Sequence, residues 1–89
     1  MPPNRTVIED NPPFRRELLA IEPDPKAADE LLEGVIWVLS RDPRQGQHFG
    51  GHYSLTWYFI ITRPGKSQLV LYYTFDDKEV LLVSIQERP

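Results

Sequence analysis

Residues 68–85, QLVLYYTFDDKEVLLVSI, constrain the fold more than any other part of the chain. Segments 69–75 and 80–85 are rich in aromatic and β-branched residues, which favour strands, and the polar residues between them suit a hairpin turn. If Phe75 pairs with Val80, both faces of this hairpin are largely apolar. A hairpin with one face in water would alternate apolar and polar residues. The sequence therefore predicts that something covers each face.

The predicted register assigns each hairpin side chain to one of the two faces, because successive side chains alternate along a strand. One face carries the pairs Tyr73/Leu82 and Leu71/Ser84. The other face carries the pairs Thr74/Leu81, Tyr72/Val83 and Val70/Ile85.

Two helices and a short strand are predicted before the hairpin. Residues 5–9 suit a short edge strand. Asn11 suits an N-cap with proline in the first turn, and Phe14, Leu18 and Ile21 then recur at helical spacing. Pro23 ends this first helix.

The main helix is predicted from about residue 26 to residue 40. Asp24 can cap it, and Pro43 prevents its continuation. Its apolar stripe is expected to face the sheet: Ala28, Leu31, Leu32, Val35, Ile36 and Leu39. Gly34 is expected to allow close packing of another element. Trp37, opposite the stripe, is expected to pack under the first helix, and an exposed anchor for a partner is the alternative.

A third strand over residues 54–62 and a Pro-Gly turn lead into the hairpin. The expected fold is a single α+β domain over residues 1–89. In it, two N-terminal helices pack on one face of a small antiparallel sheet. Two helices cover only one face of such a sheet, so the other face is a candidate partner-binding surface. The residues assigned to that surface are Val70, Tyr72, Leu81, Val83 and Ile85.

Composition narrows the classes of function. The net charge of −3 argues against a nucleic-acid binder, which needs a concentrated positive field. The first ten residues are polar and Pro-rich, and the longest apolar run is too short to cross a bilayer. We therefore expect a cytoplasmic protein without a membrane partner. The basic residues Arg41, Arg44, Arg63, Lys66 and Arg88 would form a patch if they converged, but scattered solubilising charges are the preferred interpretation.

His48 and His52 have the spacing of two metal ligands on a helix. Gly50 and Gly51 between them disfavour a helix, the chain has no cysteine, and no third ligand is signalled nearby. The loop also lacks the spacing of a phosphate or dinucleotide motif. No metal or cofactor is therefore predicted, and an acid–base role for a histidine is left open.

Two segments resemble the RelE/ParE toxin superfamily: LSRDPRQG at residues 39–46, and the hairpin from Tyr73 to Ile85. The resemblance covers residues 24–88. It implies two helices on an antiparallel sheet, and the toxin half of a type II toxin–antitoxin pair. RelE-like members of the superfamily cleave mRNA on the ribosome, and ParE-like members inhibit DNA gyrase.

The sequence departs from the nuclease pattern of that family. Val70 stands where RelE-like nucleases place an arginine, three residues before the tyrosine that matches Tyr73. Residues 54–57, SLTW, stand where those nucleases carry lysines. Arg88 matches the closing arginine of the family, and no tyrosine follows it. Phosphate chemistry needs such charges, so the resemblance favours the fold more than ribonuclease activity.

The resemblance implies an antitoxin as partner, with a second copy of the chain as the alternative occupant of the open sheet face. Contact with nucleic acid or the ribosome is left open, as is enzymatic activity. A ribosome-dependent ribonuclease is the second interpretation, with His48, His52, Tyr53 and Arg88 as its catalytic candidates. An unrelated protein-interaction domain is the third.

Overall fold

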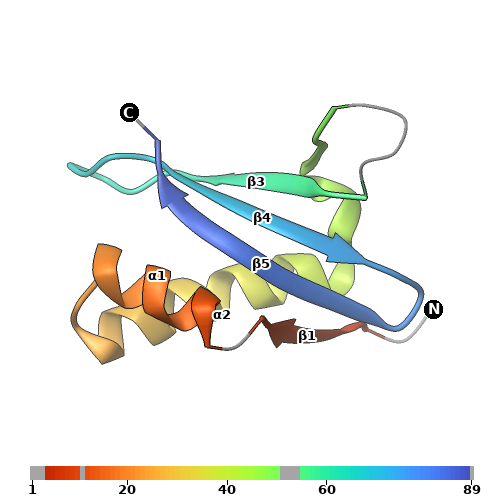
Figure 1. Cartoon of the computed structure of the whole chain (residues 1–89), viewed down its shortest axis with the longest axis horizontal. Coiled ribbons are helices and arrows are strands. Elements are labelled where there is room, and N and C mark those ends of the chain that lie inside the picture. The colour runs from red at the N-terminus through yellow and green to blue at the C-terminus, as the bar shows by residue number, and fades with distance from the viewer. Residues whose placement is uncertain (1–3, 11, 51–54, 89) are drawn as a thin grey trace.

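The computed structural model describes residues 4–10, 12–50 and 55–88. In these residues two α-helices pack with a five-stranded sheet of order β1-β5-β4-β3-β2. The elements are β1 (Thr6–Glu9), α1 (Pro13–Ile21), α2 (Pro25–Arg41), the 3-10 turn η1 (Pro43–Gln45), β2 (Gln47–His48), β3 (Trp57–Ile61), β4 (Leu69–Phe75) and β5 (Glu79–Glu87). Both helices lie below β3 and β4 in Figure 1. The predicted α+β class is confirmed.

Strands β3, β4 and β5 form the predicted antiparallel meander. The pairs Phe75/Val80 and Tyr73/Leu82 have the expected register. A bulge between Tyr72 and Tyr73 then shifts it. The pairs beyond the bulge are Tyr72/Ser84, Leu71/Ile85 and Val70/Gln86.

The bulge corrects the assignment of Ile85 to the open face of the sheet. Ile85 is 1% exposed and lies in the core opposite Leu71, where Ser84 was expected. A bulge adds one residue to one strand, so each later side chain changes face. Here the shift buries an isoleucine in place of a serine, which is the more stable arrangement by the hydrophobic effect.

Strand β1 pairs in parallel with residues 79–82 of β5 at the edge of the sheet. Beyond the end of β1, Glu17 of α1 covers the edge. Its carboxylate accepts hydrogen bonds from the Ser84 hydroxyl at 3.1 Å and from the Ile85 backbone N–H at 3.4 Å. Exposed sheet edges invite pairing with other chains, so this contact protects the remainder of β5.

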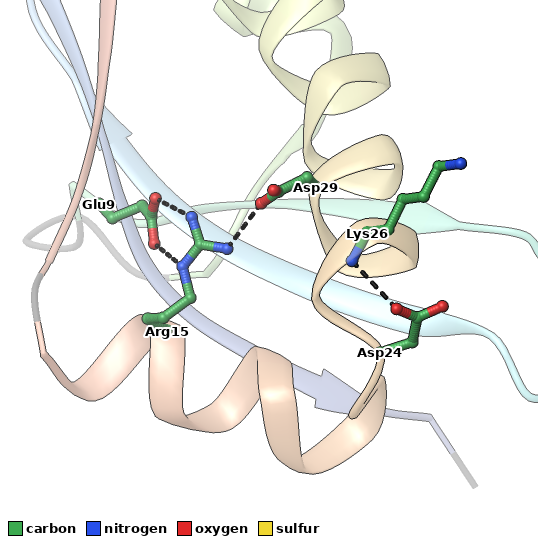
Figure 2. A network of polar contacts seen from close by, with 5 residues as sticks. All are labelled: Glu9, Arg15, Asp24, Lys26 and Asp29. Carbon is green, nitrogen blue, oxygen red and sulfur yellow. Dashed lines mark hydrogen bonds and ion pairs between the residues drawn. The ribbon is translucent and has the colours of Figure 1, made fainter.

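Helix α1 buries Phe14 and Leu18 as predicted. The expected cap, Asn11, lies outside the described residues. Figure 2 shows how Arg15 of α1 joins two other elements. Its guanidinium donates to both carboxylate oxygens of Glu9, at 3.0 and 2.7 Å, and to Asp29 of α2 at 3.1 Å. The hydrogen bond to Glu9 is the largest of the contacts that raise the pKa of Arg15.

Helix α2 begins as predicted, with the Asp24 carboxylate accepting from the Lys26 backbone N–H at 3.1 Å (Figure 2). Its buried stripe comprises Ala28, Leu32, Val35 and Leu39. Two expectations about α2 are wrong. Ile36 is 38% exposed rather than part of the stripe. A Cβ at Gly34 would meet no heavy atom within 4 Å, so no described element packs closely there.

The expectation that Trp37 packs under α1 is also wrong, because its side chain is 61% exposed. The Arg41 guanidinium lies 4.2 Å from the centroid of the indole ring, and its Nη1 donates to the Trp37 carbonyl at 3.0 Å. At 100° per residue, Trp37 falls on the side of α2 opposite the buried stripe. Helical geometry thus turns the ring towards solvent.

Tyr73 attaches the segment after α2 to the core. Its side chain is fully buried, and its hydroxyl donates to the Pro43 carbonyl of η1. Burial raises the pKa of Tyr73 to about 12, although a backbone hydrogen bond from Gly46 acts in the opposite direction. Gly46 lies so close that a Cβ would be 2.3 Å from both the Tyr58 carbonyl oxygen and the Tyr73 hydroxyl. This contact fixes the start of the segment that continues into β2.

Candidate functional site

The face of the sheet away from the helices forms the candidate site. Along β4, Leu69, Leu71 and Tyr73 point into the core, and Val70 and Tyr72 between them are half-buried on the other face. No helix among the described residues lies on this open face, since both pack on the opposite one (Figure 1). In the described part of the chain, no helix is long and apolar enough to cross a membrane.

A groove of about 540 Å³ crosses this open face. Strands β2 to β5 and the residues that follow β2 and β5 all contribute to it. Its apolar and aromatic lining consists of Phe49, Tyr58, Ile60, Val70 and Tyr72. Its polar lining consists of His48, Gln86, Glu87 and Arg88.

Edge-to-face aromatic contacts fix one wall of the groove. The Phe49 ring lies 5.6 Å from the Tyr72 centroid and 6.3 Å from the Tyr58 centroid. The Phe49 backbone N–H donates to the Thr56 carbonyl at 2.8 Å, and the Tyr58 hydroxyl donates to Gln47 at 2.6 Å. Aromatic pairs of this geometry stabilise beyond the area they bury. These contacts therefore hold the wall of the groove in one arrangement.

The charged groups of the groove come in opposite signs. Arg88 follows β5. Its backbone N–H donates to the carbonyl of Gln68, the residue before β4, at 2.7 Å, so the β4–β5 pairing continues for one more residue. The carboxylate of Glu87 accepts from the Ser67 hydroxyl at 2.6 Å. One guanidinium and one carboxylate line the groove, so these two formal charges cancel. The groove is suited to apolar and neutral polar groups more than to a phosphate chain.

Two of the four catalytic candidates, His48 and Arg88, border this groove. The ring of His48 lies edge-on to Trp57 at 5.6 Å, and Trp57 pairs with the buried Tyr73, so the imidazole lies on the helix side of the sheet. His52 and Tyr53 lie outside the described residues. Within the described part of the chain, no group of three or more His, Asp or Glu side chains is placed to hold a metal ion.

The five partner-binding candidates separate into four locations. Val70 and Tyr72 line the groove. Leu81 lines a second hollow of about 400 Å³, together with Ile8 and Leu55. Val83 is half-buried at the bulge and has no cross-strand partner in the register. Ile85 lies in the core, as described above.

Sequence patterning missed several groove residues for identifiable reasons. Phe49 lies in a Gly-rich loop with no strand periodicity, so nothing in the sequence assigned it to a face. Gln86 faces the groove as the partner of Val70 only because of the bulge. Tyr58 and Ile60 could have been found, since they alternate with the other side chains of β3 and β3 pairs with β4.

The other basic residues make separate contacts. Arg63 donates to the Ser67 carbonyl at 3.0 Å, and the Lys66 ammonium lies 3.3 Å from Glu22. The Arg44 guanidinium lies over the Phe75 ring, 5.4 Å from its centroid. Of the five residues considered for a basic patch, only Arg88 lines the groove.

No model of a protein family matches the sequence, and no curated protein does. Among solved structures, a chain of the toxin–antitoxin complex RelBE2 from Mycobacterium tuberculosis is similar, with a TM-score of 0.70 and 25% sequence identity. The match covers 96% of this chain and 99% of that chain. The chain has a RelE-like fold.

The RelE-like fold confirms the resemblance to the RelE/ParE superfamily that the sequence suggested. Because the match extends over nearly the whole of both chains, it includes both helices and the strands that carry the groove. A chain similar over its full length to part of a toxin–antitoxin complex supports a toxin-like role.

Proposed function

We propose that this protein is the toxin-like component of a type II toxin–antitoxin pair and acts by binding proteins. The observation that supports this most directly is the groove of about 540 Å³ on the open face, with its aromatic and aliphatic floor. We assign this groove to a segment of the antitoxin. The proposed place of action is the cytoplasm.

The lining of the groove favours a peptide over a nucleic acid. Peptide recognition uses apolar pockets with a few hydrogen-bonding groups. Phe49, Tyr58 and Tyr72 provide aromatic surface, and Gln86 and Arg88 provide donors. Aromatic residues and arginine dominate the energetics of protein interfaces, which is the composition found here.

Tyr72→Ala is expected to weaken antitoxin binding at least tenfold, about 1.4 kcal/mol or more, because it removes the ring that packs against Phe49 in the groove floor. The measurement is titration calorimetry with the product of the neighbouring reading frame. Ile36→Ala is the control, since it removes a partly exposed apolar side chain from α2, outside the groove. Equal affinity of the Tyr72 variant and the native chain would refute the groove as the binding site.

A ribosome-dependent ribonuclease is the second candidate function. It is favoured by the presence of Arg88 in one groove with Tyr58 and Tyr72. An arginine can stabilise a phosphate and tyrosines can stack on bases, whereas the ring of His48 packs on Trp57 at the helix side of the sheet. Against it, Val70 lines the groove where the resemblance places an arginine, and Glu87 adds a negative charge.

We therefore expect no efficient cleavage of RNA by the isolated protein, because a single guanidinium stabilises phosphate charge poorly. Defined mRNA on programmed ribosomes, analysed by primer extension, checks the ribosome-dependent reaction in parallel. Cuts at a specific codon that disappear in Arg88→Ala would establish the nuclease instead. If neither RNA cleavage nor binding to the neighbouring gene product is found, the third interpretation is favoured, an interaction domain that acts outside a toxin–antitoxin pair.

A further inference from the structure

Four exposed residues of α2 form a stripe opposite its buried side. Glu30, Gly34, Trp37 and Arg41 follow one another at intervals of four, three and four residues, which keeps them on one side of a helix. All four are exposed to solvent. We call them the outer stripe of α2. Neither the core nor the groove on the open sheet face uses it.

The outer stripe contains two features that monomer stability does not explain. Gly34 lowers helix stability relative to alanine, yet a Cβ there would meet no heavy atom within 4 Å in the described structure. Trp37 next to it exposes 61% of its surface, although aromatic side chains stabilise proteins mainly when buried. A small notch beside a large exposed ring is a shape that can receive another helix.

Arg41 is already held in a binding conformation. Its guanidinium lies 4.2 Å from the centroid of the Trp37 ring, and its Nη1 donates to the Trp37 carbonyl at 3.0 Å. The remaining N–H groups of an arginine can still donate to a carboxylate. Since the side chain is fixed in advance, less conformational entropy is lost when such a contact forms.

The order of the stripe is self-complementary. Along α2 the stripe presents the acidic Glu30, then Gly34 without a side chain, then the Trp37 ring, then the basic Arg41. The pairs Glu30/Arg41 and Gly34/Trp37 share one midpoint, between residues 35 and 36. A second α2 laid antiparallel about that midpoint brings each ring against the notch of the other copy. It also brings each Arg41 against Glu30 of the other copy. Such a two-fold contact uses the same patch on both copies.

We propose that the outer stripe of α2 binds a second copy of this chain in an antiparallel, two-fold arrangement. Charge complementarity selects this occupant, because every charged group of the stripe has its opposite at the symmetry-related position. A contact along one helix face is small among specific interfaces, so the association is weak and depends on concentration. The groove on the other side of the molecule stays open in this dimer.

Charge reversal provides the test. Sedimentation velocity of the purified full chain, from micromolar to millimolar concentration, should show a monomer–dimer equilibrium. Glu30→Arg and Arg41→Glu should each raise the dissociation constant at least tenfold, because each places like charges together twice. An equimolar mixture of these two variants should associate again, since both cross-pairs then have opposite charges. Asp77→Arg is the control. It makes the same charge change as Glu30→Arg, but at the exposed β4–β5 turn, and should leave the monomer–dimer equilibrium unchanged.

Gly34→Leu separates docking from folding. It should abolish dimerisation by filling the notch, with a thermal midpoint that is unchanged or raised, because the helix gains a better helix former and nothing lies within 4 Å. A native chain that is monomeric at all concentrations would overturn the proposal. So would a dimer that survives both charge reversals, or a mixture of the two variants that fails to associate.

Discussion

Replacing Gly46 by alanine should lower the free energy of unfolding by about 2–6 kcal/mol. The added methyl carbon would lie 2.3 Å from the Tyr58 carbonyl oxygen and from the Tyr73 hydroxyl. Overpacking a tight site costs about 1–3 kcal/mol, and displacing the buried hydroxyl from the Pro43 carbonyl adds the cost of an unsatisfied polar group, about 1–3 kcal/mol. Urea denaturation followed by circular dichroism measures the change.

Gly34→Ala is the matched control for this variant. The substitution is the same, but Gly34 is exposed within α2 and an added Cβ meets no heavy atom within 4 Å. Because alanine is the better helix former, Gly34→Ala should raise the free energy of unfolding by about 1 kcal/mol. Equal effects of the two glycine substitutions would contradict the close contact at Gly46. The Gly46 variant should also bind the antitoxin less well, because the contact holds the segment that carries His48 and Phe49.

Leu32→Ala should destabilise the protein by about 2–4 kcal/mol, because Leu32 is buried in the core and its truncation leaves a cavity. Val35→Ala should act in the same direction, as its side chain is buried on the same stripe of α2. Denaturant midpoints in urea provide the measurement.

Ile36→Ala is the control for the core substitutions. Ile36 is on the same helix but 38% exposed, so its truncation should change the free energy of unfolding by less than about 1 kcal/mol. If Leu32→Ala and Val35→Ala left the denaturation midpoint unchanged, the stripe could not face the sheet. If Ile36→Ala cost as much as Leu32→Ala, the division of α2 into a buried and an exposed side would be wrong.

The sequence by itself determined the features that depend on neighbours along the chain. Asp24 caps the start of α2, and Pro43, which has no backbone N–H, prevents the helix from continuing. Both effects act within one helical turn, so the sequence alone predicts them. The polar turn between Phe75 and Val80 set the first pairs of the hairpin. The burial of Phe14, Leu18, Leu32 and Leu39 followed from helical periodicity.

Tertiary structure alone decided the features that depend on contacts between distant segments. The bulge after Leu82 moved Ile85 into the core, since the total packing of the sheet against the helices determines where a strand adds a residue. Trp37 lies opposite the buried stripe by helical periodicity, but only the position of α1 in the fold showed that no helix of the described residues covers that side of α2. The groove joins Phe49, Tyr72 and Arg88 from three separate segments, and their proximity results from strand order rather than from spacing along the chain.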